Sequence, residues 1–383
     1  MATEKLYYAD VYCKAFEAKV VSCAPGKHGF DVVLDRTAFY PEGGGQPGDT
    51  GFLSGVRVTD THEVNGEIVH QCQTPLEAGA EVHGQIDWER RLSLMQLHSG
   101  EHIFSGIIHR RFGYDNVGFH MGADMVTIDF SGPLTEEDIR SAEREANEIV
   151  WENRSVTVTF PSEEELTHIP YRSKKALTGS VRIVTIDGAD ICACCGTHVT
   201  RTGEIGLIKI FSCVKFHEGV RLEILCGMRA YEYANLLMEQ NRKNSALLSA
   251  KPTETNAAAQ RVMEELNAAK YRAAQLENEL FSLKAEAYAG SEDVLLFCEP
   301  MAPDAVRRFA DAVLARCTGE IAIFAGDDTQ GYKYALCQKD GDLRQTVKEL
   351  NTVCHGRGGG KPFFAQGSVA AARAQIESFF AGR

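Results

Sequence analysis

Two short motifs, far apart in the chain, each place a pair of potential metal ligands four residues apart. The segment HSGEHIFSG contains His98 and His102, and the segment CACCGTHV contains Cys194 and His198. On a helix, residues four apart lie about 40° apart around the axis, so His98 and His102 project from one face. Together the two pairs make a His₃Cys set of the kind that binds tetrahedral zinc. A fold that uses this set must bring the two segments together.

The surroundings of these pairs add a catalytic candidate and an ambiguity. Glu101 lies about 60° to the other side of His98 on the same helix, close enough to touch a water molecule beside a metal. With the two histidines it forms H-x-x-E-H, the pattern of inverted zinc peptidases. On the second segment, Cys192 and Cys195 compete with Cys194 for the ligand role. The sequence leaves the identity of the thiol ligand open.

A glycine-rich stretch, RTAFYPEGGGQPGDTG, occupies residues 36–51. Its three consecutive glycines expose backbone N–H groups and permit a ligand to approach the main chain closely. Such a loop fits a phosphate, a ribose or an aminoacyl ester. The same composition also fits a turn-rich hairpin without a ligand, so the stretch alone does not distinguish a ligand-binding loop from a simple hairpin.

The composition of the chain bears on its cellular compartment and on its binding partners. The 383 residues carry a net charge of −13, which argues against a non-specific polyanion binder but not against a local basic patch. No apolar run reaches the length of a membrane span, and the start MATEKLYYAD lacks the apolar block of a signal peptide. We expect a soluble, cytoplasmic protein without a membrane partner. Its 12 cysteines then indicate metal binding or catalysis rather than disulfides.

The hydrophobic pattern changes near residue 87. Residues 1–86 alternate polar and apolar positions in KVVSC, FDVVLD, VRVTDTHEV and EIVHQC, which predicts a small antiparallel, barrel-like β region. Residues 87–227 begin with a helix for which Asp87 is the expected N-cap and Gly113 the expected end. Strands and a second helix with a Thr cap follow without βαβ regularity. We therefore predict an α+β domain here.

Residues 228–289 are expected to be helical, with a break at Lys251–Pro252. In the second helix apolar residues recur at a 3-4 spacing, which indicates a coiled-coil seam. The seam comprises Ala259, Val262, Leu266, Ala269, Ala273, Leu276, Leu280, Leu283 and Ala287. Its partner is either the preceding helix, folded back as a hairpin, or a second subunit in a homodimer.

Residues 290–383 alternate strand and helix patterns and are predicted to form a compact α/β domain. The stretch HGRGGGKPFFAQGSV, before a terminal helix, is expected to be a glycine loop. Arg357 and Lys361 flank its glycines, which would allow a phosphate to approach the backbone closely.

Taken together, these motifs resemble a known family. FYPEGGGQPGDTG, HSGEHIFSG and CACCGTHV, in this order and spacing, resemble the editing domain of alanyl-tRNA synthetases and the free-standing alanyl-tRNA editing proteins of the AlaX group. HGRGGGKPFFAQGS resembles the loop of the DHH-associated domain that accompanies such editing modules. The likeness covers nearly the whole chain and is closest to the long AlaX form. No ATP- and alanine-activating domain precedes the β region, so we do not expect a complete synthetase.

The resemblance implies zinc-dependent hydrolysis of mischarged tRNA(Ala), chiefly seryl and sometimes glycyl. One Zn²⁺ per chain would be held by His98, His102, Cys194 and His198. This chain departs from the synthetase pattern twice, with Glu101 where Thr is frequent and Cys195 where Gly is frequent. The first departure favours a chemical role for Glu101, which we predict to be the catalytic base or to position water.

Further site residues follow from this interpretation. The candidate substrate-binding residues are Thr37, Tyr40, Gly43, Gly44, Gly45, Gln46 and His120. The candidate tRNA-binding residues are Arg357, Gly358, Gly359, Gly360 and Lys361. The expected macromolecular partner is tRNA(Ala), and the helical segment would set the distance between its two binding regions.

Two other interpretations stay open. Four protein ligands resemble a closed structural zinc site, so the chain could be a zinc-stabilised tRNA-binding adaptor without catalysis. H-x-x-E-H also fits an inverted zinc peptidase, but that class uses a downstream carboxylate as third ligand, whereas this chain supplies C-x-x-x-H. The peptidase also leaves the glycine-rich stretch without a role.

Overall fold

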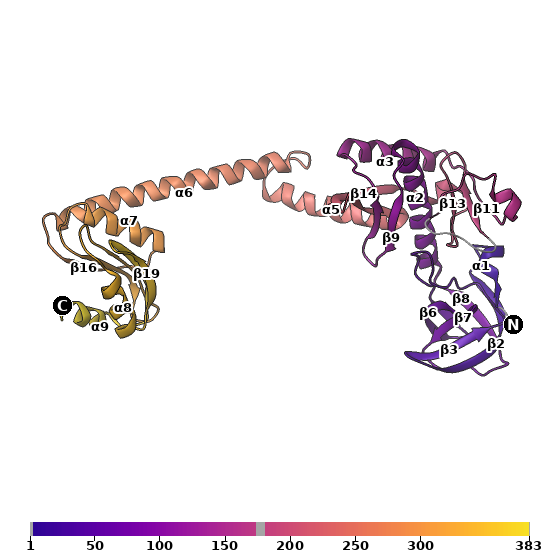
Figure 1. Ribbon diagram of the computed structural model, residues 1–383, viewed down its shortest axis with the longest axis horizontal. Helices are drawn as coiled ribbons and strands as arrows, with labels where there is room; N and C mark the ends of the chain where they lie inside the picture. Colours follow the sequence, from indigo (N-terminus) through magenta and orange to yellow (C-terminus); the bar gives the residue numbers. More distant parts are fainter. Residues whose placement is uncertain (1–2, 174–180, 383) are drawn as a thin grey trace. The chain divides into compact units, whose positions relative to one another are not determined.

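The computed structural model describes residues 3–173 and 181–382. The chain divides into two compact units, Met1–Asn241 and Arg242–Arg383. Figure 1 shows strands and helices in both units, as the predicted α+β class requires.

The first unit begins with the predicted β region. Its elements are β1 (Glu4–Lys5), α1 (Leu6–Ala9), β2 (Ala15–Gly26), β3 (Gly29–Leu34), β4 (Arg36–Thr37), β5 (Gly51–Leu53), β6 (Val56–Val64), β7 (Glu67–Cys72) and β8 (Glu81–Ile86). Six strands hydrogen-bond in the ring order β2-β3-β7-β6-β5-β8, and β8 pairs back to β2. Alternate residues of β2, including Phe16, Ala18 and Val20, are buried in a hydrophobic cluster inside this ring. The period-2 pattern thus reflects one buried face per strand.

The helix that carries HSGEHIFSG is α2 (Trp88–Phe112). It ends as predicted, at Gly113 in the left-handed conformation with φ 70°. Asp87 is the N-cap residue, as predicted, but its carboxylate makes no capping hydrogen bond. It is held instead by Arg57, whose Nη2 lies 2.7 Å from Asp87 Oδ2. The Arg57 guanidinium binds both carboxylate oxygens of Asp87, so these oxygens do not accept the backbone N–H groups of the helix.

The rest of the first unit surrounds α2. Its elements are β9 (Asn116–Met121), β10 (Val126–Phe130), α3 (Glu136–Trp151), β11 (Val156–Thr159), α4 (Glu163–Leu166), β12 (Ile183–Ile186), β13 (Asp190–Ala193), η1 (Thr202–Ile205), β14 (Ile208–Phe216), β15 (Gly219–Cys226) and α5 (Gly227–Leu247). The predicted Thr cap of α3 is confirmed, since Thr135 and Asp138 form a capping box. Because α3, β13 and β15 all pack against α2, every residue from 97 to 108 is buried.

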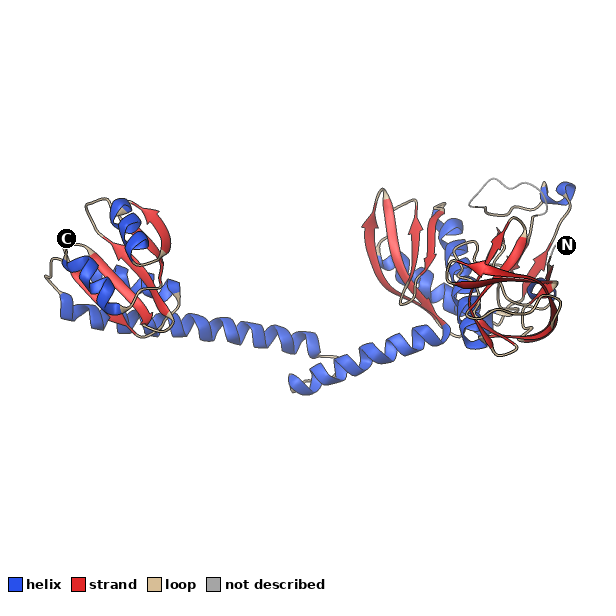
Figure 2. Ribbon diagram, turned by 90° about the horizontal axis from the view of Figure 1, so that it is seen from below, coloured by secondary structure: helices blue, strands red, loops and turns tan. Residues whose placement is uncertain are grey.

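The second unit is built around one five-stranded sheet of order β16-β17-β18-β20-β19. Its elements are α6 (Thr255–Ala285), η2 (Glu286–Tyr288), β16 (Val294–Cys298), α7 (Pro303–Leu314), β17 (Ile321–Asp327), β18 (Gly331–Cys337), α8 (Arg344–Val353), β19 (Arg357–Lys361), β20 (Phe364–Val369) and α9 (Arg373–Ala381). Helices cover both faces of the sheet (Figure 2), with α7 on one hydrophobic cluster and α8 and α9 on the other.

The predicted glycine loop near the C-terminus is a strand, which corrects the expectation. Arg357–Lys361 form the edge strand β19 and pair antiparallel with β20. A side chain at Gly358 would collide with the Tyr334 hydroxyl and with Gly367. Glycine therefore allows the two strands and the tyrosine to approach closely here. The sequence pattern does not indicate this strand, because residues 357–361 contain no alternating apolar residues.

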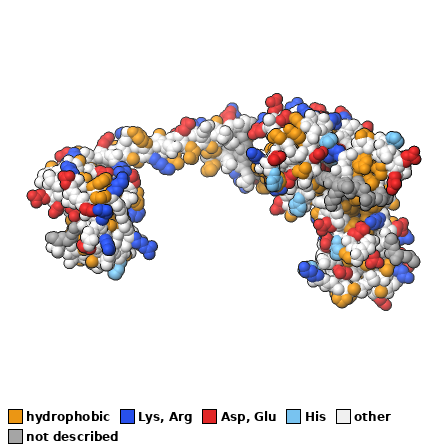
Figure 3. All heavy atoms as spheres, in the orientation of Figure 1, with side chains coloured by type: hydrophobic (Ala, Val, Ile, Leu, Met, Phe, Trp, Pro, Cys, Tyr) orange, Lys and Arg blue, Asp and Glu red, His pale blue; other side chains and the backbone are white. Residues whose placement is uncertain are grey.

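The predicted seam residues are exposed in the single chain, except for the half-buried Ala259, and no coiled-coil partner for them is seen within the described residues. Figure 3 shows hydrophobic side chains on the surface of the helical segment. The C-terminal part of α6 packs through Phe281 against Phe309 of α7, and Ala258 near its start is also buried. Across the described ranges, no helix combines the length and the apolarity that crossing a membrane needs.

One buried ion pair connects α2 to the β region. Arg91 of α2 is fully buried, and its Nε lies 2.8 Å from Asp49 Oδ2. The guanidinium also donates to the carbonyl oxygen of Ala38 at 2.7 Å. Asp49 Oδ2 in turn accepts the backbone N–H of Tyr40 at 2.7 Å. This pair therefore fixes the glycine-rich stretch against the helix that carries His98.

We predict that Arg91→Met strongly destabilises the first unit, because it leaves the Asp49 carboxylate buried without its partner. Removing one member of a buried pair costs about 3–5 kcal/mol. The matched control is Arg140→Met on α3, whose pair with Glu136 is exposed and contributes at most about 0.5 kcal/mol. Thermal unfolding followed by circular dichroism measures both. Equal unfolding temperatures for the two variants would contradict the assigned role of Arg91.

Candidate metal centre

The structure brings the two predicted ligand pairs together. His98 and His102 come from α2, and Cys194 and His198 come from the turn after β13. The ligand atoms of these four residues all lie within 4.8 Å of one another. Cys194 Sγ lies 3.4 Å from His98 Nε2 and 3.4 Å from His198 Nε2. The predicted thiol, Cys194, faces the histidines, whereas Cys195 is exposed.

Each imidazole is oriented by a partner at its Nδ1 atom. His98 Nδ1 lies 3.0 Å from Gln46 Oε1, and His102 Nδ1 lies 3.0 Å from Asp190 Oδ2. His198 Nδ1 lies 3.1 Å from Ser99 Oγ. An acceptor at Nδ1 keeps the proton there and leaves the Nε2 lone pair free. All three Nε2 atoms are therefore available to one metal ion.

The position of the Gln46 side chain supports this tautomer at His98. Gln46 Oε1 also accepts the backbone N–H of Thr197 at 3.1 Å, while Gln46 Nε2 donates to Thr197 Oγ1 at 2.8 Å. The amide orientation is fixed by these two bonds, so the atom that faces His98 is an acceptor. Gly196 makes the contact possible, because a Cβ there would lie 2.1 Å from His98 Cε1.

The electrostatics of the cluster suit a cationic ligand. Burial alone would raise the pKa of the Cys194 thiol, but the neighbouring His98 and His102 hold that pKa well below its usual value. Burial lowers the pKa of His198 to about 3, which keeps this imidazole neutral. Burial opposes a charge on His102, but Cys194, Cys192 and Asp190 raise the pKa of this imidazole well above its usual value. Zinc binds a thiolate and neutral imidazoles, so the binding of a metal would release the proton of His102.

The spacing of the donor atoms also suits zinc. With Zn–N near 2.0–2.1 Å and Zn–S near 2.3 Å, tetrahedral geometry places a sulfur and a nitrogen ligand about 3.5 Å apart. The two measured Sγ–Nε2 separations are 3.4 Å. The donor set, its protonation and its spacing therefore all fit one zinc ion.

Glu101 is buried beside the metal ligands rather than on the surface. Its Oε2 lies 3.9 Å from His102 Nε2, the atom that faces the metal position. Its Oε1 accepts the Ser105 hydroxyl at 2.6 Å and a hydrogen bond from the Asn116 amide. Two donors on one oxygen stabilise the ionised carboxylate and direct the other oxygen toward His102.

A hollow of about 980 Å³ adjoins the partners of the metal ligands. Asp190 and Asn116 lie on its wall, together with Arg172, whose Nε donates to Asp190 Oδ1 at 2.8 Å. Asn116 is buried, and its Oδ1 has no hydrogen-bond partner among the residues that the structure describes. A buried carbonyl without a partner is an acceptor available to a bound molecule.

The predicted glycine loop is a tight two-residue turn. Gly43 and Gln46 exchange backbone hydrogen bonds of 3.0 Å, and Gly44 and Gly45 between them have φ values of 63° and 85°. Positive φ at both central residues favours glycine. Gly45 packs against Phe119 of β9, whose ring lies 5.5 Å from that of His98. The turn is therefore close to the metal position.

The other predicted substrate residues are placed differently. Tyr40 is buried and donates from its hydroxyl to the Gly43 carbonyl oxygen at 3.1 Å. Thr37 is fully buried, with Oγ1 2.8 Å from His70 Nε2. His120 is exposed on β9, where its neighbour Phe119 makes the contact with His98. Side chains alternate along a strand, so only one of these two can face the site.

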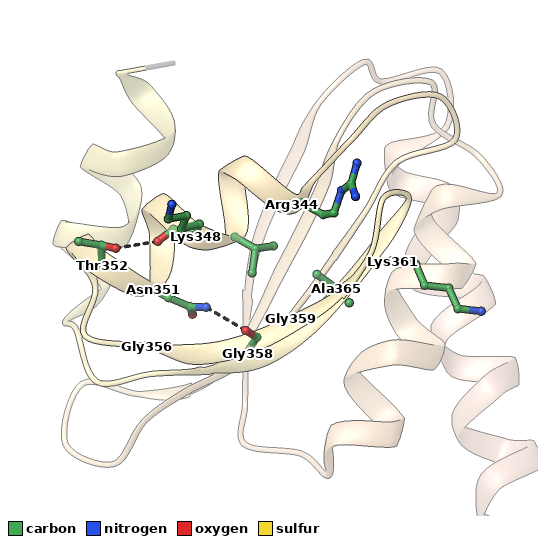
Figure 4. Close-up of a pocket in the computed structure, with 11 residues that line it drawn as sticks. Arg344, Lys348, Asn351, Thr352, Gly356, Gly358, Gly359, Lys361 and Ala365 are labelled. Carbon is green, nitrogen blue, oxygen red and sulfur yellow. Dashed lines mark hydrogen bonds between the residues drawn. The ribbon is translucent and has the colours of Figure 1, made fainter.

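In the second unit, the glycine strand borders a hollow of about 520 Å³ (Figure 4). Lys361 lines it from β19, and Arg344 and Lys348 line it from α8. Asn351 Nδ2 donates to the Gly358 carbonyl oxygen at 3.1 Å. Arg357, at the other end of the strand, borders a separate hollow of about 660 Å³ together with Lys333. The two predicted cations therefore lie on different hollows beside one exposed strand.

Several residues of the site are missing from the sequence prediction. Ser99 and Asp190 are adjacent to or close to a ligand in sequence, so a search for polar neighbours of the ligands would have included them. Ser105, three residues after His102, carries the same signal, but Asn116 and Phe119 do not. Their roles arise from the packing of β9 against α2.

Comparisons with known proteins agree with this geometry. Residues 2–90 match the family described as tRNA synthetases class II (A). Residues 181–222 match the threonyl and alanyl tRNA synthetase second additional domain, which includes Cys194 and His198. Residues 294–381 match the DHHA1 domain. The three matches cover the β region, the segment with Cys194 and His198, and the sheet domain of the second unit, whereas His98 and His102 lie outside them.

Full-length relatives extend these matches. The chain is similar to the alanyl-tRNA editing protein AlaX-L of Pyrococcus horikoshii, at 31% identity over 97% of this chain and 96% of that protein. It is 32% identical to an alanine–tRNA ligase of Pyrococcus abyssi, over 98% of this chain but 43% of the ligase. A ligase of Ignicoccus hospitalis is 33% identical over 40% of its length. Because the first likeness spans nearly the whole of both proteins, the chain belongs to the family of alanyl-tRNA editing proteins of the AlaX-L type.

Proposed function

We propose that this protein is an aminoacyl-tRNA deacylase that hydrolyses the ester of mischarged tRNA(Ala), chiefly Ser-tRNA(Ala) and also Gly-tRNA(Ala). The observation that carries the proposal is the buried His₃Cys cluster with Glu101 directed at its centre. Zinc held by His98, His102, Cys194 and His198 would supply a Lewis acid that polarises the ester carbonyl.

The chain's own residues supply the remaining chemistry. Glu101 accepts a proton from the attacking water, whose oxygen adds to the ester carbonyl carbon. The bond from that carbon to the ribose oxygen then breaks, and the proton returns to the ribose. Ser105 and Asn116 hold Glu101 in place for this transfer. A fixed carboxylate beside the reacting centre is the usual arrangement of a general base.

The hollow beside Asn116 is the proposed position of the aminoacyl end. Arg172 on its wall is charged but neutralised by Asp190, so the hollow accepts a polar group without favouring an anion. Asn116 Oδ1 would accept the seryl hydroxyl or the α-amino group. An alanyl ester has no hydroxyl to offer, and an unsatisfied buried acceptor costs about 1–3 kcal/mol.

The non-catalytic adaptor is disfavoured by the same cluster. A structural zinc site has no need of a buried carboxylate whose Oε2 lies 3.9 Å from the Nε2 atom of a ligand, and such a carboxylate is costly to bury. The peptidase alternative lacks its carboxylate ligand, since Cys194 and His198 occupy the remaining positions.

We predict that the protein deacylates Ser-tRNA(Ala) about ten- to hundredfold faster than Ala-tRNA(Ala), and that a zinc chelator abolishes both activities. His98→Ala and Cys194→Ala should lose zinc together with activity, because each removes one of four ligands. Cys195→Ala is the matched control and should keep one zinc per chain, since Cys195 is exposed.

Metal analysis and a deacylation assay on purified variants give these results directly. Full zinc occupancy in both His98→Ala and Cys194→Ala would remove the proposed site. Zinc loss confined to Cys195→Ala would change the thiol ligand but leave the reaction intact. Equal rates on the seryl and alanyl substrates would refute selective editing.

A second prediction concerns the general base. Glu101→Gln should lower kcat for Ser-tRNA(Ala) by about 10²-fold or more while zinc stays bound, because a neutral amide cannot accept the proton. The control Glu136→Gln changes an exposed carboxylate on α3 and should be neutral. Unchanged turnover in Glu101→Gln would assign the activation of water to other groups.

A third prediction concerns the second unit, which we propose holds the body of tRNA(Ala) along β19. Arg357→Ala with Lys361→Ala should raise KM for full-length tRNA and reduce its salt dependence, while kcat is retained, because uniform binding energy is removed. Arg261→Ala with Arg307→Ala removes the same charge from exposed positions elsewhere and serves as control. Steady-state kinetics at several salt concentrations measure KM and kcat for both double variants. An equal rise in KM in both double variants would indicate only a general charge effect.

A further inference from the structure

The turn that supplies Cys194 and His198 is held by side chains from outside it. Residues 194–198 follow β13 directly and form a short connection between the two ligands. Arg182, immediately before β12, is buried and donates from Nη1 to the carbonyl oxygens of Cys194 at 2.7 Å and Gly196 at 2.9 Å. A backbone rotation in so short a turn would move the thiol relative to the imidazole. These hydrogen bonds therefore bear on the geometry of the metal site.

The carbonyl group between those two is held by the N-terminal segment of the chain. Tyr8 of α1 donates from its hydroxyl to the Cys195 carbonyl oxygen at 3.0 Å. The Tyr8 ring also lies against the Arg182 guanidinium, whose Cζ is 5.0 Å from the ring centroid. At this distance the face of an aromatic ring attracts a cation. Tyr8 thus holds the turn twice, through its hydroxyl and through the position of Arg182.

A second tyrosine of the same segment holds the chain just after His198. Tyr12 Oη accepts the backbone N–H of Thr200 at 3.0 Å and donates to the Glu204 carboxylate, with 2.7 Å to either oxygen. Glu204 belongs to η1 and is joined to α2, since Gln96 Nε2 donates to the Glu204 carbonyl oxygen at 2.8 Å. Tyr12 therefore connects the end of the turn to the helix that carries the other two ligands.

The segment that carries both tyrosines is itself anchored in the β region. Tyr7 is buried and packs edge-on against Tyr40, with ring centroids 5.5 Å apart. The Val11 carbonyl oxygen accepts a hydrogen bond from Nη1 of the buried Arg91 at 3.3 Å. Strand β1, directly before α1, pairs in parallel with β4. A segment fixed at these points can impose a position on the turn rather than follow it.

From these contacts we infer that Tyr8 and Tyr12 are positioning residues that hold the turn in the conformation in which Cys194 and His198 reach one metal ion. The two tyrosines act through the backbone of the turn and are not metal ligands. The inference rests on the zinc binding assumed in the proposed function. Partners that orient metal ligands in this way typically contribute about 10–100-fold to metal affinity.

The first experiment removes each hydroxyl and keeps each ring. Tyr8→Phe and Tyr12→Phe should each raise the zinc dissociation constant about tenfold or more, and the double variant should bind zinc more weakly than either. Tyr231→Phe, which removes a hydroxyl from an exposed ring on α5, is the matched control and should keep the wild-type affinity. Competition for zinc with a chelating colour indicator measures all four variants and the wild type.

The second experiment separates positioning from general stabilisation. Thermal unfolding of each variant is followed with the protein metal-free and again at one fixed zinc concentration. A contribution to folding alone would lower both unfolding temperatures and leave their difference unchanged. Weaker binding makes the difference smaller, because a ligand stabilises the folded state according to its affinity. We expect a smaller zinc-dependent rise in Tyr8→Phe and Tyr12→Phe than in Tyr231→Phe.

Two results would overturn the inference. Wild-type zinc affinity in the double variant would show that neither hydroxyl acts on the metal site. An unchanged zinc-dependent rise in the unfolding temperature of that variant would leave the tyrosines with a general structural role. Both results are compatible with the proposed deacylase, whereas a wild-type protein that binds no zinc would contradict the proposed function together with this inference.

Discussion

The hydrogen bonds at the Nδ1 atoms of the three histidines are the constraint on which the rest of the first unit depends. Each comes from a different segment: Gln46 from the glycine turn, Asp190 from β13, and Ser99 from α2 itself. A metal ion needs three Nε2 lone pairs aimed at one point, and a single misplaced partner would turn a ring away. The β region, α2 and the turn after β13 must therefore pack together before the site exists.

This requirement explains why the central part of α2, residues 97–108, is buried on all sides. A helix that presented only one face to the core would leave Asp190 or Gln46 without contact to its imidazole. The surrounding elements also remove water from the site, which strengthens the interaction of Glu101 with His102 and any cation near it. The buried Arg91–Asp49 pair contributes by fixing the glycine stretch to the same helix.

The second unit also depends on glycine, but in a strand rather than in a turn. In β19, small residues let the backbone of an edge strand lie open between two hollows lined by Lys and Arg side chains. A polyanion can approach such a backbone closely despite the net charge of −13 over the chain. The helix α6 carries an exposed apolar stripe that includes Leu276, Leu280 and Leu283.

The sequence by itself determined the ligand pairs, the buried strands, the cap at Thr135 and the heptad of α6, because each depends on spacing within one segment. It could not determine the contacts between segments that are far apart in the chain. That Phe119 rather than His120 faces His98 follows from the register of β9 against β10, and that Gln46 holds an imidazole follows from the packing of a turn onto α2. The glycine strand was mistaken for a loop because its partner β20, rather than its own side chains, makes it a strand. Local patterns record side-chain periodicity, whereas the contacts that orient a catalytic group join residues far apart in the chain, and only the tertiary structure specifies them.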